Sequence, residues 1–114
     1  MVYVSITGLR LNGPTYLPRF LWHAFRSMRQ AQKAPGNISA SARTIKGVHH
    51  TLSVWADEAS MRQYLISGDH LKAMKIFSQI ATGKTCGYLT ATVPDWDEAR
   101  DIWEAKGREV RSAG

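Results

Sequence analysis

The spacing of the apolar residues changes within the first 32 positions, and this change restricts the possible folds. In residues 2–8 apolar and polar side chains alternate, which is the period of a half-buried strand. After the break "NGP", the apolar residues from Thr15 to about Gln32 recur at steps of three and four, as on an amphipathic helix. A strand is therefore expected to be followed directly by a long helix.

The rest of the chain continues this exchange between strand and helix periods. The expected elements are, in order, strands 38–46 and 48–55 around Gly47, helices 58–67 and 70–81 with Asp57 and Asp69 as N-caps, strand 85–93, and helix 96–106 capped by Asp95. The order β-α-β-β-α-β-α predicts an α+β, ferredoxin-like fold with an added C-terminal helix. A chain of 114 residues is long enough for one core, so residues 1–114 are expected to form a single domain.

The expected sheet has a face that the two crossover helices do not cover. Tyr3, Tyr88 and other partly apolar positions of the first and fourth strands are assigned to this face. An uncovered face of this kind usually meets a second copy of itself. The sequence therefore predicts a homodimer whose two sheets pack together or close into a barrel.

The charge of the chain is distributed unevenly. Residues 1–56 carry seven Lys or Arg and no acidic residue, whereas residues 57–114 carry eight Lys or Arg and nine Asp or Glu. Such asymmetry indicates an anionic ligand, a nucleic-acid surface or an acidic partner. The alternative is a solvated helix face formed by Arg19, Arg26, Arg29 and Lys33.

Cysteine content and hydropathy bear on the compartment. Cys86 is the single cysteine, so no intramolecular disulfide or cysteine-based zinc site can form, and a buried structural thiol is expected. The N-terminus alternates like a strand and does not resemble a signal peptide, and no apolar run approaches the roughly 20 residues of a spanning helix. The expected location is the cytoplasm, with no membrane span.

A family resemblance rests on the segment "LSVWADEASMRQYLISGDHLKAMK", residues 52–75. In its position after two strands, it resembles the corresponding part of the dimeric α/β-barrel superfamily. That superfamily includes antibiotic-biosynthesis monooxygenases, haem-degrading monooxygenases and spheroidene-monooxygenase-like proteins. The resemblance implies a partly hollow core that receives an apolar or aromatic small molecule, and a small oxidoreductase that oxidises it.

The haem-degrading members of this superfamily carry an Asn on the first strand, a Trp in the second helical region and an iron-binding His ten residues later. Here Thr7 or Gly8, Tyr64 and Met74 stand at those positions, so the chain departs from that pattern at each of them. Another histidine would have to bind iron, and the expected cofactor is either none or haem.

His70 is the strongest candidate for chemistry. It follows the expected cap Asp69 in the first turn of a helix, where the helix dipole disfavours protonation and a neutral imidazole can accept a proton or bind a metal. The residues Gly68, Asp69, His70, Ala73 and Met74 also resemble the "G-x-H" pattern, followed by small and apolar residues, of spheroidene-monooxygenase-like proteins. The alternative for His70 is an exposed bystander. His49 and His50 should point to opposite faces of a strand, and no pair of histidines has zinc-site spacing.

Large aromatic residues complete the predicted site. Trp22, Phe25, Trp55 and Tyr64 are expected to line an apolar cavity between the sheet and the helices, with His70, Tyr64 and Trp55 as the catalytic candidates. The sequence thus favours a monooxygenase-like oxidoreductase or small-molecule-binding protein. The alternatives are a non-catalytic dimeric assembly or sensing module, and an RNA-binding domain that uses the basic N-terminal half.

Overall fold

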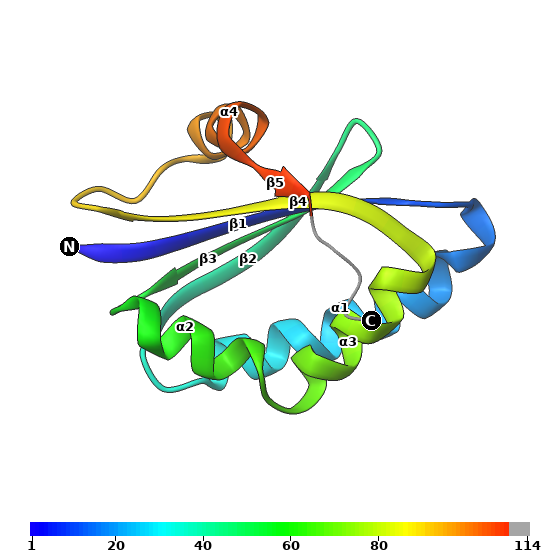
Figure 1. Ribbon diagram of the computed structural model, residues 1–114, viewed down its shortest axis with the longest axis horizontal. Helices are drawn as coiled ribbons and strands as arrows, with labels where there is room; N and C mark the ends of the chain where they lie inside the picture. The colour runs from blue at the N-terminus through cyan, green and yellow to red at the C-terminus, as the bar shows by residue number, and fades with distance from the viewer. Residues whose placement is uncertain (110–114) are drawn as a thin grey trace.

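An antiparallel sheet lies between two layers of helix in the computed structural model, which describes residues 1–109 (Figure 1). The strands are β1 (Val2–Leu11), β2 (Asn37–Ile45), β3 (Val48–Trp55), β4 (Ala81–Thr90) and β5 (Arg108–Glu109), in the spatial order β2-β3-β1-β4-β5. The helices are the short 3-10 turn η1 (Pro14–Tyr16), α1 (Leu17–Lys33), α2 (Glu58–Leu65), α3 (Gly68–Ile80) and α4 (Trp96–Lys106). The predicted ferredoxin-like order with an added C-terminal helix is confirmed.

Two of the three predicted N-caps form as expected. Asp57 accepts a hydrogen bond from the backbone N–H of Ser60, and Asp95 accepts one from the backbone N–H of Glu98, each at 2.8 Å. The third prediction is wrong, because α3 begins at Gly68 and its N-cap is Ser67. Gly68 has a φ of 55°, which lets the chain turn immediately after α2. Asp69 instead lies in the first turn of α3.

The fourth strand is longer at its start than the sequence indicated. It runs over Ala81–Thr90 rather than over residues 85–93, because its first residues pair with the end of β1, from Leu11↔Ala81 to Gly8↔Lys84. The sequence "ATG" has the composition of a turn, but pairing with the long central strand outweighs this local preference. As a result, α3 ends at Ile80 and passes into β4 without a loop.

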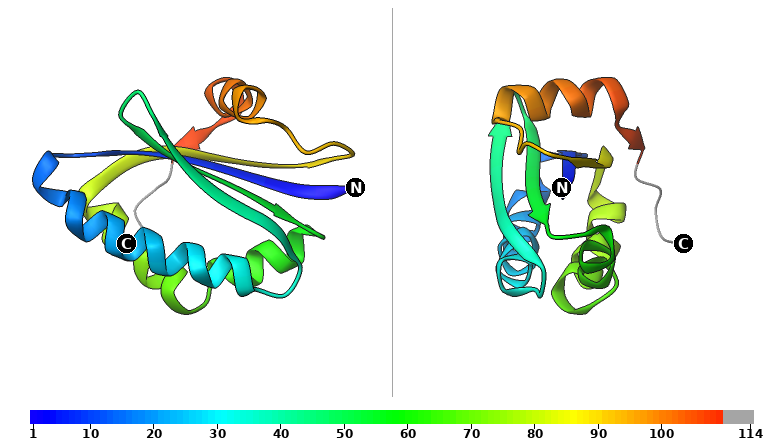
Figure 2. Two further views of the ribbon diagram at one scale, coloured as in Figure 1. Left: turned by 180° about the vertical axis from the view of Figure 1, so that it is seen from behind. Right: turned by 90° about the vertical axis from the view of Figure 1, so that its left-hand side faces the viewer.

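The face that was expected to be uncovered carries α4. Figure 2 shows α4 on one side of the sheet and α1, α2 and α3 on the other. Ala99 and Trp103 of α4 are buried in one cluster with Val4, Ile6, Val48, Leu52 and Val54 of the sheet. The assignment of Tyr3 to this face was also wrong, because Tyr3 packs with Trp55 and Met61 on the helix-layer side. Apolar area on the α4 side therefore stabilises the single chain.

The short strand β5 pairs with Lys84 and Thr85 of β4 and is the last element of the described residues. Among residues 1–109, no helix combines the length and the apolar character that crossing a bilayer requires.

Candidate active site

A cavity of about 1110 Å³ lies between the sheet and the layer formed by α1, α2 and α3. Its position follows from the inward-facing residues of the strands. On β1 these residues are Tyr3, Ser5, Thr7 and Leu9, which read large, small, small, large. Tyr3 belongs to a buried cluster at one end of the sheet, and Leu9 belongs to a second cluster at the other end. The two clusters hold the layers apart, and the short side chains between them leave the cavity.

The neighbouring strands repeat this pattern and give the cavity a polar floor. The inward row of β3 has Thr51 and Ser53 between His49 and Trp55, and β4 contributes Gly83, Thr85 and Gly87 to the lining. The hydroxyls of Thr7 and Thr85 lie 3.2 Å apart, and Thr85 also donates to the carbonyl of Ile6 at 3.3 Å. The opposite wall is mostly apolar, with Phe20, Ala24 and Met28 of α1 and Met74 and Phe77 of α3. A ligand in this space would meet hydroxyl groups on one side and hydrocarbon on the other.

His70 lines the cavity and is held by two hydrogen bonds. Its backbone N–H donates to the side-chain oxygen of Gln30 at 2.7 Å, which ties the start of α3 to α1. Its Nδ1 lies 3.1 Å from the carbonyl oxygen of Leu65. Because a carbonyl only accepts, Nδ1 must carry a hydrogen, and in the neutral ring Nε2 is then the unprotonated nitrogen.

Burial, opposed by the Leu65 carbonyl, lowers the pKa of His70. The sequence had assigned this effect to the helix dipole behind an Asp69 cap, but Asp69 caps nothing and lies 3.3 Å from the guanidinium of Arg26. The imidazole is therefore neutral near pH 7, with Nε2 available to accept a proton or to bind a metal ion.

Tyr64 and Trp55 form a row of rings with His70. The Tyr64 ring centre is 4.4 Å from that of His70 and 5.2 Å from that of Trp55. The Tyr64 hydroxyl donates to the carbonyl of Ser27 at 3.1 Å and lies 2.7 Å from the Ser27 hydroxyl. Burial, partly opposed by Ser27, raises the pKa of Tyr64 to about 12. The phenol stays protonated at physiological pH, so Tyr64 is held in place rather than poised to act as a base.

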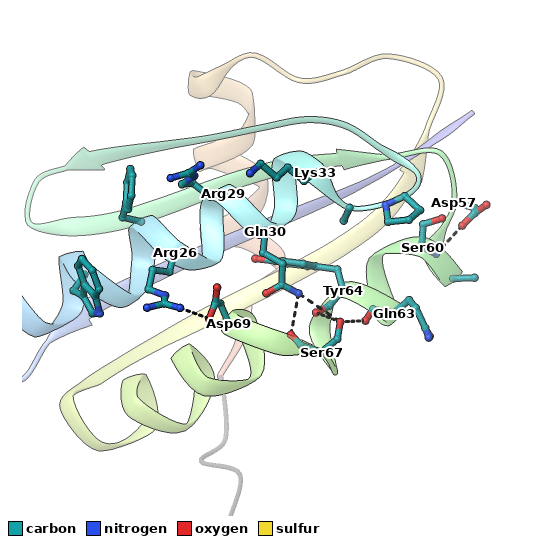
Figure 3. Close-up of a pocket in the computed structure, with 15 residues that line it drawn as sticks. Arg26, Arg29, Gln30, Lys33, Asp57, Ser60, Gln63, Tyr64, Ser67 and Asp69 are labelled. Atoms are coloured by element: carbon teal, nitrogen blue, oxygen red, sulfur yellow. Dashed lines mark hydrogen bonds and ion pairs between the residues drawn. The ribbon is translucent and has the colours of Figure 1, made fainter.

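The structure places the predicted residues at three different depths. Tyr64 and His70 line the cavity, whereas Trp55 is fully buried behind Tyr64 and donates its indole N–H to Ser53 at 2.9 Å. Phe25 lies at the rim, where it lines both the cavity and an outer groove between α1 on one side and α2 and the start of α3 on the other. Trp22 was expected in the cavity but lines only this groove, of which Figure 3 is a close-up view. The three catalytic candidates thus lie close together, but two of the four aromatic residues expected to line the cavity, Trp22 and Trp55, do not line it.

Sequence reasoning missed the hydroxyl floor and His49. His49 lines the cavity, with its ring 4.7 Å from that of Phe20 and its Nδ1 2.8 Å from the Thr44 hydroxyl. Burial lowers the pKa of His49. The available signal was the small-residue pair in the middle of each inward row, Ser5 and Thr7 on one strand and Thr51 and Ser53 on the next. Where paired strands carry small inward-facing residues at the same level, they predict a hollow. The positions of the histidines and tryptophans do not indicate it.

Within residues 1–109, no group of three His, Cys, Asp or Glu side chains gathers in a way that could hold a metal ion. His70 would be able to hold a haem iron, because its Nδ1–H is fixed by a carbonyl and Nε2 would be left for the metal. The lining residues therefore fit a ligand without metal, or a haem held through this one nitrogen.

No protein-family model matches the sequence, and no curated protein matches it. Solved structures do match. SnoaB, a cofactor-independent oxygenase from Streptomyces nogalater, superposes with a TM-score of 0.68 at 14% identity, over 82% of this chain and 98% of SnoaB. A candidate antibiotic biosynthesis monooxygenase from Nitrosomonas europaea gives 0.71 at 12% identity, over 79% of this chain and 99% of its own.

A further antibiotic biosynthesis monooxygenase gives a TM-score of 0.68 at 13% identity, over 82% of this chain and 100% of its own. At these identities the likeness shows the fold. The predicted resemblance to antibiotic-biosynthesis monooxygenases is therefore confirmed for the fold alone, and the reaction has to be argued from the cavity.

Proposed function

We propose that the protein is a small monooxygenase-like oxidoreductase that binds an apolar, aromatic small molecule in the central cavity. One observation carries this proposal: a neutral histidine, fixed at Nδ1 and unpaired at Nε2, lies in a large cavity with hydroxyls on one wall and hydrocarbon on the other. The fold shared with a cofactor-independent oxygenase adds support for the same reaction class. Because one fold serves many reactions, this likeness supports the proposal only together with the cavity and His70.

His70 would act as the base that begins the reaction. A base whose pKa is lowered removes only acidic protons effectively, so the substrate carbon must be activated by a conjugated hydroxyaromatic system. Removal of one proton by Nε2 leaves a delocalised carbanion. The hydrocarbon wall and the Thr7 and Thr85 hydroxyls would orient this ring system and exclude water.

The reaction with oxygen then needs no further reductant. The carbanion gives its electron pair to O₂ and forms a C–O bond, and His70 returns its proton to the resulting peroxide anion. Loss of water, made from the outer peroxide oxygen, its proton and the remaining hydrogen of the carbon, leaves a carbonyl group. One oxygen atom enters the product and the other leaves as water, while the substrate supplies all the electrons.

Tyr64 and Trp55 would position His70 rather than exchange protons themselves. The protonated Tyr64 phenol is tied to Ser27, and its ring packs between those of Trp55 and His70. Phe25 would contact the ligand at the rim, and Trp22 is too far round the helix to touch a ligand in the cavity. If haem is bound instead, His70 Nε2 would be its ligand, and the iron would supply the oxygen chemistry.

The test is a titration of 1-naphthol and of haem into wild-type protein and His70→Ala, with thermal melts and oxygen uptake measured in parallel. We expect at least a tenfold loss of affinity in the variant, roughly 1.4 kcal/mol, without unfolding. His23→Ala is the matched control, because His23 lies on α1 and lines neither the cavity nor the outer groove. Equal affinities in wild type and His70→Ala would refute the role of His70.

The same experiment separates the alternatives. Binding of 1-naphthol and of a series of activated hydroxyaromatics without oxygen uptake would favour a non-catalytic binding or sensing module. A Soret band in the protein as purified would favour haem, and a colourless protein would favour direct oxygenation.

We also propose a cytoplasmic homodimer. The sheet face assigned to dimerisation is partly covered by α4, so a second copy would meet the outer edge of β4. Beyond Thr85 that edge has no partner strand within residues 1–109, and Leu89 there is 59% exposed. Light scattering should give about twice the 12.8 kDa chain mass at micromolar concentration. A monomer at that concentration would exclude this assembly.

A further inference from the structure

Helix α1 has two apolar faces, and the protein covers only one of them. Phe20, Ser27 and Ala31 are buried on the inner face. On the outer face Leu21 is 51% exposed, and Trp22 and Phe25 are each 58% exposed. Large apolar side chains on the solvent side of a helix that is already anchored indicate a second contact surface.

This outer surface is also basic. Helix α1 carries Arg19, Arg26, Arg29 and Lys33 and no acidic residue. The guanidinium of Arg26 lies 5.5 Å from the Trp22 ring centre and that of Arg29 lies 5.8 Å from the Phe25 ring centre. Arg26 is paired with Asp69, whereas Arg29 and Lys33 have no ion pair within the described residues. Figure 3 shows Arg29 and Lys33 projecting from α1 on the side away from Asp69.

The positive charge of α1 is part of an uneven distribution of charge between the two sides of the sheet. The adjacent helix α3 adds Lys72 and Lys75, and Asp69 is the one acidic residue of the two helices. On the opposite side of the sheet, α4 and its cap carry five acids, Asp95, Asp97, Glu98, Asp101 and Glu104, against Arg100 and Lys106. The two sides are separated by the sheet (Figure 2). An anionic surface would attract the α1–α3 side and repel the α4 side.

We propose that the outer surface of α1 and α3 binds peripherally to an anionic membrane, with Leu21, Trp22 and Phe25 entering the headgroup region and Arg29 and Lys33 contacting lipid phosphates. Interfacial helices have this composition, with Trp, Phe and Leu beside Lys and Arg on one exposed surface. Basic residues near an anionic bilayer each add roughly fivefold to affinity. Leu21 and Phe25 also line the rim of the cavity, so an apolar ligand dissolved in the bilayer would be close to its binding site.

Other occupants fit this surface less well. A second copy related by a twofold axis would place the same unpaired cations against one another. Single-stranded RNA would use the two aromatic rings for stacking but would leave exposed Leu17, Leu21 and Ile66 without a role. A bilayer satisfies the aliphatic, the aromatic and the basic side chains together.

The experiment is co-sedimentation of the full chain with vesicles of phosphatidylcholine alone and of phosphatidylcholine with about a third phosphatidylglycerol. We expect binding to the anionic vesicles only, weakening as salt rises, with a blue shift of tryptophan emission. Arg29→Gln with Lys33→Gln should weaken binding about 30-fold, because two cations near the surface are lost. Trp22→Ser with Phe25→Ser should weaken it at least tenfold, and Trp22→Phe should remove the blue shift while binding persists.

The matched control is Arg10→Gln with Lys46→Gln, which likewise removes two positive charges. Both positions are exposed, Arg10 near the C-terminal end of β1 and Lys46 in the turn between β2 and β3. This control should bind as wild type. The proposal is overturned if wild type stays in solution with anionic vesicles at low salt, or if both double charge variants lose affinity equally. Binding to poly-uridylate as tight as to vesicles, lost in the Arg29 and Lys33 variant, would assign the surface to RNA instead. None of these readouts depends on ligand binding or oxygen uptake.

Discussion

The two faces of one sheet have opposite degrees of packing. Between the same strands, the face toward α1, α2 and α3 leaves a cavity of about 1110 Å³, whereas the face toward α4 is filled by Val4, Ile6, Leu52 and Val54 beneath Trp103. The difference lies in alternate residues of β1. Ser5 and Thr7 face the cavity, and Val4 and Ile6, one position away, face α4. Close packing and open space therefore lie on opposite faces of a single strand.

The filled face, toward α4, includes a histidine whose ring nitrogens make no hydrogen bond within the described residues. His50 is 2% exposed, and neither ring nitrogen has a hydrogen-bond partner among residues 1–109. Its ring lies edge-on beneath Trp103, with centroids 4.7 Å apart. On the open face, His70 and His49 each have a partner for Nδ1. The buried histidine on the filled face thus carries an unsatisfied polar group, and those on the open face keep one nitrogen for a ligand.

The largest expected difference between the faces comes from removing a large side chain. Trp103→Ala should cost about 3–5 kcal/mol of unfolding free energy, because Trp103 is buried against Gly8 and His50 and donates its indole N–H to the Lys84 carbonyl at 2.8 Å. Met74→Ala on the cavity wall should cost less than about 2 kcal/mol, because one side of Met74 already faces open space. Urea unfolding of both variants measures the comparison.

Met61→Ala is a useful reference for these two variants, because Met61 is buried in the cluster at one end of the cavity. This substitution should lower the free energy of unfolding by about 2–5 kcal/mol. If Trp103→Ala and Met74→Ala cost the same, the two faces do not differ in packing and the cavity is not a property of the protein in solution.

Adding a side chain should also destabilise the filled face more than the cavity face. In Gly8→Ala, the new methyl group would meet Trp103 at 2.6 Å from Cε2 and His50 at 2.9 Å from Cε1, so we expect a loss of about 1–3 kcal/mol. Ser5→Leu places three more carbons in the cavity and should change stability by less than about 1 kcal/mol, while abolishing 1-naphthol binding. Calorimetric melts and the same ligand titration decide this. If Ser5→Leu unfolds the protein, the polar floor of the cavity is closely packed.

How far the sequence determined the fold can be seen at the helix caps and at β4. Asp57 and Asp95 cap their helices because the signal is local, an acceptor side chain three residues before a free N–H. The start of β4 was wrong because Ala81–Lys84 become a strand only by pairing with Leu11–Gly8, seventy residues earlier in the chain. Coverage of the second face by α4 was missed for the same reason, since burial of Trp103 depends on Gly8 and His50.

The site was predicted unevenly for a related reason. His70, Tyr64 and Trp55 lie within one short segment, so their proximity follows from a strand joined to two helices. The hydroxyl floor comes from three strands distant in sequence, and it becomes visible only when the register places Thr7 opposite both Thr51 and Thr85. Trp22 was misplaced because three- and four-residue spacing does not tell the inner apolar face of α1 from the outer one.

The smallest expected effect is a pH dependence to which both faces contribute. Burial is the main cause that lowers the pKa of His50 and of His70. For His50, the Thr7 backbone and Glu104 oppose this shift, whereas Arg100 and His49 add to it; Arg43 lies directly across on β2. Well above the unfolded-state pKa of about 6.5, both histidines are neutral in both states and contribute no dependence.

As the pH falls below about 6.5, His50 and His70 bind protons in the unfolded chain but stay neutral in the folded chain. The free energy of unfolding should therefore decrease. The slope is at most about 1.4 kcal/mol per pH unit for each histidine. Urea unfolding between pH 8 and pH 5 should show a shallower slope for His50→Leu and for His70→Leu, and the shallowest slope for the double variant. A ligand held by the neutral His70 should steepen the wild-type slope, since bound protein then resists protonation further, and should leave the His50 contribution unchanged. Two results would contradict this prediction: a wild-type profile that is flat over this range, or a His50→Leu profile parallel to that of wild type. Either result would show that His50 can be protonated beneath Trp103 without loss of stability, and that water reaches the face toward α4.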